Sequence, residues 1–278
     1  HMKEDYMRNG QLKPGYNVNV ATCSDFIIGS YISSDRNDVH TLIPFMEQLR
    51  KNYAGRNIGS VVVDSGYESE ENYCWFEAHP ETELYVKPSN HEAVKHRKYR
   101  TDISRRENMA YDAQADAYTC ANGKLLQRTR EKKTHTASGL EIATSVYECN
   151  ECDGCPLKEK CIRACGSKKP LEERYKVIYV SKRFARQRQA MEAKISSPKG
   201  CLLRVNRSIQ AEGNFAYVKQ DLDFRRFLLR GNMKVAAEWL LFSFALNILH
   251  LHHKIQNRRL KHAAEKTCTS SICLRGSV

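Results

Sequence analysis

Several features are missing from this sequence, and each absence excludes a class of protein. Residues 1–15 are polar and basic with no apolar core, so we expect no secretory leader there and a reducing, cytoplasmic setting. The longest apolar stretch, residues 235–251, is broken by Glu238, Ser243, Asn247 and His250, which predicts a buried helix and no membrane span. No internal repeat is present, which argues against a repeat architecture.

Acidic residues are fewer than basic ones. The chain has 45 Lys and Arg against 32 Asp and Glu, a formal charge of +13 over 278 residues. Basic residues gather at 96–100, 128–133 and 182–188. Any one cluster is usually solvated surface, but a whole-chain excess with interleaved Tyr and Phe favours nucleic acid as a partner. The 41% hydrophobic content excludes a disordered chain.

Hydrophobic periodicity predicts an α/β protein. Two alternating runs, 16–22 and 26–32, predict a hairpin, and a β-branched run at 58–63 predicts a buried central strand. Helices are expected after Asp38, an apparent N-cap, and at about 69–79, with a further strand at 84–86. This order predicts a mixed sheet with flanking helices.

Composition predicts a folded domain that is interrupted by an insertion. Residues 1–87 form its first part, and the basic, core-poor stretch 88–200 is an expected insertion. Helical periodicity returns over 201–260, with apolar positions of 233–256 on one stripe that predicts packing on the sheet. Residues 261–278 show no pattern and are expected to be a loose tail.

Two carboxylates are candidates for metal-dependent chemistry. Asp64 follows the predicted central strand, where ligands of α/β sheets usually bind, although such an acid is more often a turn former. In a helix, Glu212 and Lys219 would share one face, although an exposed pair fits the same spacing. Carboxylate oxygens suit Mg²⁺ or Mn²⁺, and paired metals can catalyse phosphoryl transfer.

The cysteines form one cluster with ligand spacing. Cys149, Cys152, Cys155 and Cys161 fit a tetrahedral structural Zn²⁺ site within the basic insertion. Reduced thiols without metal are the alternative, and an iron–sulfur cluster is a second one. The remaining cysteines, with the exception of nearby Cys165, have no such spacing and are expected to be ordinary thiols: Cys23, Cys74, Cys120, Cys201, Cys268 and Cys273.

Four segments, in this order, resemble the insertion-sequence DDE transposases. They are Gly-Tyr-Asn-Val at 15–18, Val-Asp-Ser-Gly-Tyr at 63–67, Glu-Gly-Asn-Phe-Ala-Tyr-Val-Lys at 212–219, and Arg-Arg-Phe-Leu-Leu-Arg-Gly at 225–231. The resemblance covers about residues 10–260. It implies a ribonuclease-H-like fold that cleaves DNA and transfers strands with two aspartates and one glutamate on divalent metal. It also implies a bacterial, nucleoid-associated enzyme that is a homo-oligomer in its full-length form.

Carried over residue by residue, the resemblance makes Asp64 the second acid, Glu212 the third, and Lys219 a DNA contact. Arg225 and Arg226 are further DNA-binding candidates. Related enzymes place an arginine four positions before the glutamate; Ser208 stands there, and Arg207 is one position earlier.

The first acid is the main departure from the family pattern. It should lie on a strand upstream of residue 15, where only Asp5 occurs in a polar context. We therefore expect the first strand to be absent, unpaired strand edges to remain, and this chain alone to be inactive. The alternative is a non-catalytic, zinc-stabilised DNA-binding remnant of a mobile element.

Overall fold

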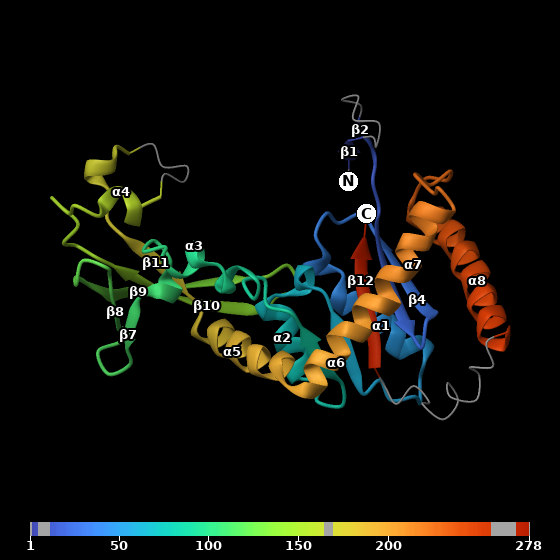
Figure 1. The fold of residues 1–278 in the computed structure, drawn as a ribbon. Helices are drawn as coiled ribbons and strands as arrows, with labels where there is room; N and C mark the ends of the chain where they lie inside the picture. Colours follow the sequence, from blue (N-terminus) through green and yellow to red (C-terminus); the bar gives the residue numbers. More distant parts are fainter. Residues whose placement is uncertain (1, 5–11, 164–168, 257–270, 278) are drawn as a thin grey trace. The chain divides into compact units, whose positions relative to one another are not determined.

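The computed structural model describes residues 2–4, 12–163, 169–256 and 271–277 (Figure 1). The chain forms two compact units. The first unit joins His1–Ser89 to Ala190–Val278, and the second is Asn90–Gln189, which falls within the predicted insertion.

A mixed five-stranded sheet forms the centre of the first unit. Its order is β4 (Phe26–Ser33), β3 (Asn17–Cys23), β12 (Ser271–Ser277), β5 (Ser60–Val63) and β6 (Glu83–Val86). β3 is antiparallel to both of its neighbours, whereas β12, β5 and β6 run parallel. The predicted mixed α/β sheet, its hairpin and its buried central strand are confirmed.

The position of β12 was not predicted. This strand lies between β3 and β5, with Cys273 opposite Thr22 on one side and Val62 on the other. Ile272, Cys273 and Leu274 are buried, so the prediction of a loose tail is wrong for residues 271–277. The expected unpaired edges are also wrong, because β12 supplies hydrogen-bonding partners to both strands.

Helix α1 (Leu42–Asn52) covers the sheet with its periodic apolar residues, Leu42, Phe45, Met46 and Leu49, all fully buried. Asp38 is not its N-cap, as the sequence had suggested. It begins the short 3-10 turn η1 (Asp38–His40), and Thr41 precedes the helix. Helix α2 (Glu70–Glu77) follows the turn η2 (Ser65–Tyr67) and is capped by the Ser69 hydroxyl.

The predicted helix over 206–222 forms, but not as one regular α-helix. α6 (Pro198–Arg207) continues into a π-helical turn η6 (Ser208–Glu212), then α7 (Gly213–Ala216) and a second π-helical turn η7 (Tyr217–Asp221). Phe215 and Val218 pack with Val18, Val20 and Ile27 of the sheet. The helical segment is therefore anchored on β3 and β4.

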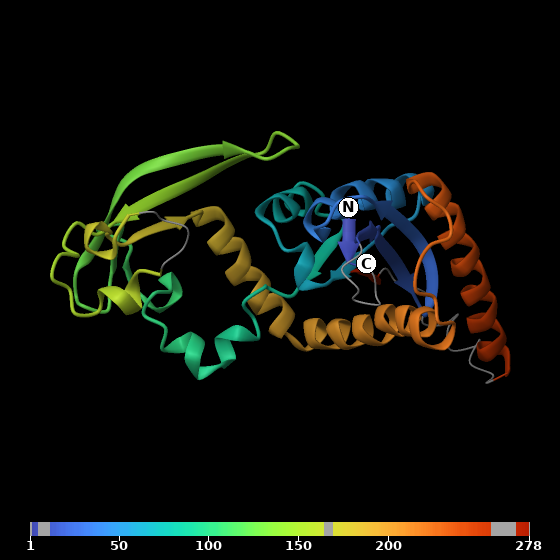
Figure 2. The ribbon, with the colours of Figure 1, turned by 90° about the horizontal axis from the view of Figure 1, so that it is seen from above.

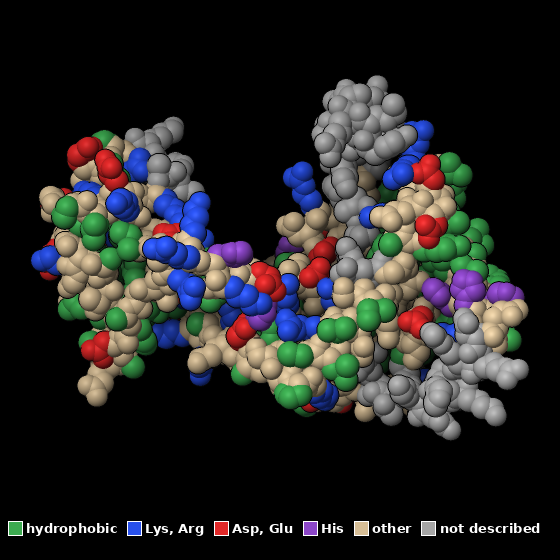
Figure 3. Space-filling view, viewed as in Figure 1, with side chains coloured by type: hydrophobic (Ala, Val, Ile, Leu, Met, Phe, Trp, Pro, Cys, Tyr) green, Lys and Arg blue, Asp and Glu red, His purple; other side chains and the backbone are tan. Residues whose placement is uncertain are grey.

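Helix α8 (Asn232–Gln256) packs one stripe against the same core through Val235, Trp239 and Leu246, as predicted. Its other face carries a line of exposed apolar side chains, visible along this helix in Figure 3: Met233, Leu240, Leu241, Phe244, Ile248, Leu251 and Ile255. By length and composition alone, α8 is long and apolar enough to cross a membrane. On these two criteria the expectation that its polar residues make it too short for a membrane span is wrong. A core helix of a water-exposed protein meets the same two criteria.

The second unit is built on an antiparallel sheet in the order β11 (Val177–Val180), β10 (Glu141–Glu148), β9 (Leu125–His135), β8 (Ala117–Thr119) and β7 (Ala110–Asp112). The long β9–β10 hairpin is clear in Figure 2. Leu126, Tyr147 and Cys149 form its core with Ile178 and Val180. Helix α5 (Lys182–Ser196) contains the boundary between the units.

The remaining elements are short. A two-stranded sheet pairs β1 (Met2–Glu4) with β2 (Leu12–Pro14). The second unit also contains η3 (Ala93–Lys95), α3 (Arg97–Arg100), η4 (Arg106–Asn108), α4 (Lys158–Cys161) and η5 (Leu171–Glu173). Cys23 at the end of β3 is disulfide-bonded, so the prediction of an ordinary thiol is wrong for this residue.

Candidate active site

Asp64 lies at the carboxyl end of β5, as the sequence predicted. Its Oδ1 accepts a hydrogen bond from the Ser65 backbone N at 2.8 Å, which caps the turn η2. The side chain is 41% exposed, so its second oxygen can reach a ligand from solvent. The turn-forming and functional interpretations are therefore compatible, because one oxygen serves each purpose.

Arg207 approaches the same carboxylate from the end of α6. Its Nη1 lies 4.0 Å from Asp64 Oδ2, and its side chain is only 13% exposed. A guanidinium at this distance contributes a weak, long ion pair. The structure thus brings together two predicted site residues, although the role predicted for Arg207, DNA binding, stays a prediction.

A second carboxylate lies beside Asp64 that the sequence analysis did not select. Burial raises the pKa of Asp38, the Asn17 amide partly offsets this, and the charge of Asp64 raises it further. Asn17 Nδ2 donates to Asp38 Oδ1 at 2.6 Å. A Cβ on Gly66 would lie 3.0 Å from Asp38 Oδ2, so this glycine leaves room for the carboxylate. Two acids therefore converge at this end of the sheet.

A buried hydrogen-bond network holds these motifs together. Tyr67 donates to Asn19 Oδ1 at 2.5 Å, and the Thr41 hydroxyl donates to the same oxygen at 2.8 Å. Asn19 is fully buried, and burial with the charges of Asp38 and Asp64 raises the pKa of Tyr67 well above its usual value. The Gly-Tyr-Asn and Asp-Ser-Gly-Tyr segments thus meet in one network.

Glu212 lies in the π-helical turn η6, but its side chain is outside what the structure describes. Its neighbour Ala211 is buried against Val62 of β5 and Cys273 of β12. The backbone at 212 is therefore next to the strand that precedes Asp64. A Cβ on Gly213 would contact nothing within 4 Å, so packing does not explain the glycine after Glu212.

Lys219 is exposed in the second π-helical turn, with its Nζ 5.7 Å from the centre of the Phe215 ring. The prediction that it shares a face with Glu212 assumed an unbroken α-helix. Two π-helical turns change that angular relation, since each adds residues per turn, and π-helical turns are frequent at functional sites.

The loop before α8 presents Arg225 and Arg226, both exposed. Arg225 pairs with Asp223 at 2.6 Å. The loop is held by Glu238, whose carboxylate accepts from the backbone N–H groups of Leu228 and Leu229 at 3.0 to 3.1 Å. The predicted DNA-binding arginines therefore stand on an ordered loop.

Two polar residues, Tyr16 of the first family-like segment and Asn247 of α8, have structural roles. Tyr16 accepts a hydrogen bond from Gly231 N at 2.8 Å, which ties the first segment to the last. Asn247 of α8 accepts from Ile27 N and donates to Ile27 O, both at 2.8 Å, and so satisfies backbone groups of β4. Both contacts hold α8 and the loop before it against β3 and β4.

The four cysteines predicted to bind zinc all line one cavity of about 20 Å³ in the second unit. Cys120, which the sequence analysis took for an ordinary thiol, lines it too. Within the described ranges, no three His, Cys, Asp or Glu side chains are already grouped as a ready metal site. Cys165 lies outside the described residues.

A sequence model of the transposase DDE domain family matches residues 119–252, a little under half of the chain. The match includes Arg207, Glu212 and Lys219 together with the cysteine cluster, and it leaves out Asp64. No curated protein and no solved structure matches the sequence. Residues 119–252 of this chain are therefore similar to the transposase DDE domain family.

Proposed function

We propose that this chain is the catalytic region of an insertion-sequence DDE transposase, in which Asp64 and Glu212 hold Mg²⁺ or Mn²⁺ for DNA cleavage and strand transfer. The observation that carries the proposal is the convergence of Asp64 and Asp38 at one sheet end, next to the helical segment of Glu212. Carboxylate oxygens on a partly exposed strand end suit a hard divalent cation.

The bound metal would activate an attacking oxygen and stabilise the leaving oxygen of the scissile phosphate. The residues of the chain have separate tasks. Asp64 offers the oxygen that Ser65 leaves accessible, and the Asn19 network fixes the turn on which Asp64 stands. Lys219, Arg225 and Arg226 are exposed cations suited to hold DNA phosphates.

The proposal extends to fold and assembly. Three antiparallel strands followed by two parallel ones support a ribonuclease-H-like sheet in which β12 lies between β3 and β5. β12 carries no carboxylate, so the first acid of the family is not supplied by this strand. We propose that the active enzyme is a homo-oligomer that acts on DNA of the bacterial nucleoid. A structural Zn²⁺ in the cysteine-rich segment belongs to the same proposal.

Metal binding tests the proposal without requiring activity. Mn²⁺ titration of the full chain, followed by electron paramagnetic resonance, should weaken roughly tenfold or more in Asp64→Asn and in Glu212→Gln. Glu47→Gln, an exposed acid on α1, is the matched control and should bind as the parent does. Unchanged Mn²⁺ binding in both site variants would remove the basis of the catalytic assignment.

The second candidate is a non-catalytic, zinc-stabilised DNA-binding remnant. The absence of a carboxylate on β12 favours it, because the strand beside β5 is where a further acid would be expected. This candidate predicts salt-sensitive DNA binding that persists in Asp64→Asn, together with no Mn²⁺ binding at all.

A further inference from the structure

Cys120 lies far in sequence from the cysteine cluster but at the same cavity. It follows β8 in a tight turn, in which Cys120 N donates to Lys124 O at 2.9 Å and Gly123 N donates to Cys120 O at 2.9 Å. Gly123 adopts a φ of 73°, a conformation that favours glycine. The turn therefore presents Cys120 to the cavity that Cys149, Cys152, Cys155 and Cys161 line.

The five thiols do not occupy equivalent positions. Cys161 is close enough to Cys120, Cys152 and Cys155 for their charges to influence its titration. Cys149 is 1% exposed and packs in the hydrophobic core with Leu126 and Tyr147, whereas Cys120 and Cys152 pack on the edge of that core. Cys149 therefore has the surroundings of a core thiol.

Cations and N–H donors surround the sulfur atoms of this cavity, including that of Cys149. Lys124, Lys158 and Lys176 line the cavity, and the backbone N of Lys176 donates to Cys152 Sγ at 3.4 Å. Four thiolates around Zn²⁺ carry two net negative charges, which these lysines would offset.

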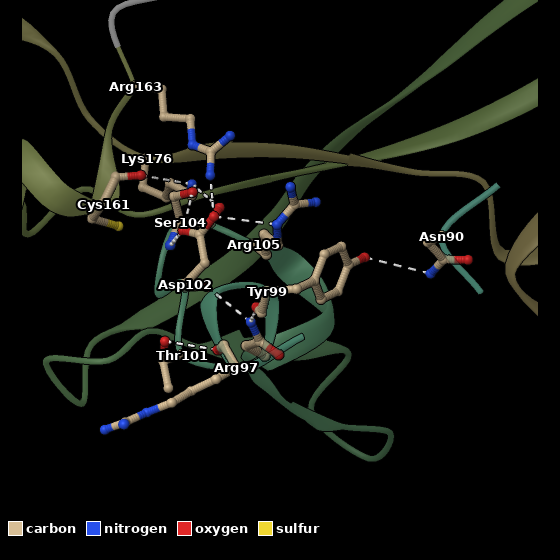
Figure 4. A network of polar contacts seen from close by, with 11 residues as sticks. Asn90, Arg97, Tyr99, Thr101, Asp102, Ser104, Arg105, Cys161, Arg163 and Lys176 are labelled. Atoms are coloured by element: carbon tan, nitrogen blue, oxygen red, sulfur yellow. Dashed lines mark hydrogen bonds and ion pairs between the residues drawn. The ribbon is translucent and has the colours of Figure 1, made fainter. Parts of the chain in front are cut away.

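A network of polar contacts fixes the segment after α4. Figure 4 shows the Lys176 amine between two backbone oxygens, donating to Ser104 O at 2.6 Å and to Cys161 O at 2.9 Å. Asp102 accepts from the Ser104 hydroxyl at 2.6 Å and pairs with Arg163. These contacts hold Cys161 in place without using its sulfur, which stays available to a ligand.

We propose that Cys120, Cys152, Cys155 and Cys161 bind one Zn²⁺ as a four-thiolate structural site, and that Cys149 is a core thiol. This rests on the proposed zinc ion but is independent of catalysis at Asp64. A cavity of about 20 Å³ has room for one small ion. The thiols surround it without forming a closed ligand group, so binding would release thiol protons and draw the sulfur atoms together.

Zinc content separates this ligand set from the one that spacing predicts. The full chain, prepared in reducing buffer with Zn²⁺ and then dialysed, should retain one zinc per chain by elemental analysis. Cys120→Ala should lower the zinc affinity at least roughly tenfold. Cys149→Ala is the matched control and should retain stoichiometric zinc. Co²⁺ in place of Zn²⁺ should give thiolate-to-metal absorption that Cys120→Ala weakens and Cys149→Ala preserves.

A rescue variant distinguishes the loss of a zinc ligand from misfolding of the chain. Cys120→His should restore metal binding with a shifted Co²⁺ spectrum, because imidazole is a zinc ligand. Zinc that survives Cys120→Ala but is lost in Cys149→Ala would overturn the proposal, as would a parent chain that retains no zinc. Neither result depends on Mn²⁺ binding at Asp64, so the two proposals can fail separately.

Discussion

Asp38 in the first unit and Asp116 in the second are both held by polar side chains, but their pKa values shift in opposite directions. The Lys182 amine donates to both Asp116 oxygens at 2.8 Å and holds the pKa of Asp116 well below its usual range. Burial raises the pKa of Asp38, whose hydrogen-bond partner is the uncharged Asn17 amide.

This difference separates a structural acid from a candidate functional one. Asp116, in the turn before β8, also accepts a hydrogen bond from Tyr147 of β10 at 2.7 Å. Its carboxylate is therefore already paired with Tyr147 and with Lys182 of α5. Asp38 instead lies near a second carboxylate, Asp64, which forms an ion pair with Arg207 at 4.0 Å. Two neighbouring carboxylates would be stabilised by a bound divalent cation.

The largest expected effect is at Asp116. Asp116→Ala should lower the free energy of unfolding of the second unit by about 2–3 kcal/mol, since charged and phenolic donors lose their acceptor. Because its folded pKa lies below the ordinary 3.8, this stabilisation is present above that pH and is lost as the pH falls below it. Hydrogen exchange of β8 and β10 amides measures it.

The control for Asp116 is Asp153→Ala, which changes an acid whose side chain is 94% exposed. It should change exchange protection very little. If Asp116→Ala were equally harmless, the distinction between the two units would not hold.

A smaller effect is expected at Gly66. Gly66→Ala places a Cβ 3.0 Å from Asp38 Oδ2 and should lower stability by about 1 kcal/mol while weakening Mn²⁺ binding. Gly213→Ala is the opposite case, because its Cβ meets nothing within 4 Å, and it should stabilise the helix by up to about 1 kcal/mol. Urea unfolding measures the change in stability of both variants. Equal changes would show that Gly66 is not needed to leave room for the Asp38 carboxylate.

The smallest effect concerns the charge of Asp38. A raised folded pKa means that the protonated form is favoured, so Asp38 opposes folding once the pH rises above its ordinary pKa. Asp38→Asn should therefore raise stability at pH 7 by less than about 1 kcal/mol, and the gain should vanish near pH 3. Thermal unfolding across this range measures it; a gain that is larger at pH 3 would contradict the assignment.

Patterns carried by adjacent residues were predictable from the sequence. The β3–β4 hairpin and the buried β5 that ends just before Asp64 both follow from the pattern of a few adjacent residues. The cysteine spacing likewise located one cavity. A short window is sufficient for these features because each depends on residues that are adjacent in the sequence.

Features that depend on distant contacts were missed. Asp38 resembles a helix cap until Asn17 and Asp64 are brought beside it, and Cys120 has no ligand spacing until its hairpin meets the cysteine cluster. The apolar face of α8 also escaped prediction, because a helix apolar on both sides has little periodic signal. Pairing across long sequence separations leaves no pattern in a short window.

The position of β12 between β3 and β5 determines when the sheet of the first unit can form during translation. The Thr22 hydroxyl donates to the backbone oxygen of Cys273, a residue 251 positions later, and β3 and β5 meet only through the strand that carries it. During translation, β3 and β5 would leave the ribosome long before β12 is made, with hydrogen-bonding groups unsatisfied on both. The first unit would therefore close late and slowly, since its sheet depends on contacts of very high sequence separation. In the antiparallel sheet of the second unit, each strand pairs with the strand next to it in the sequence, so this sheet can fold during translation.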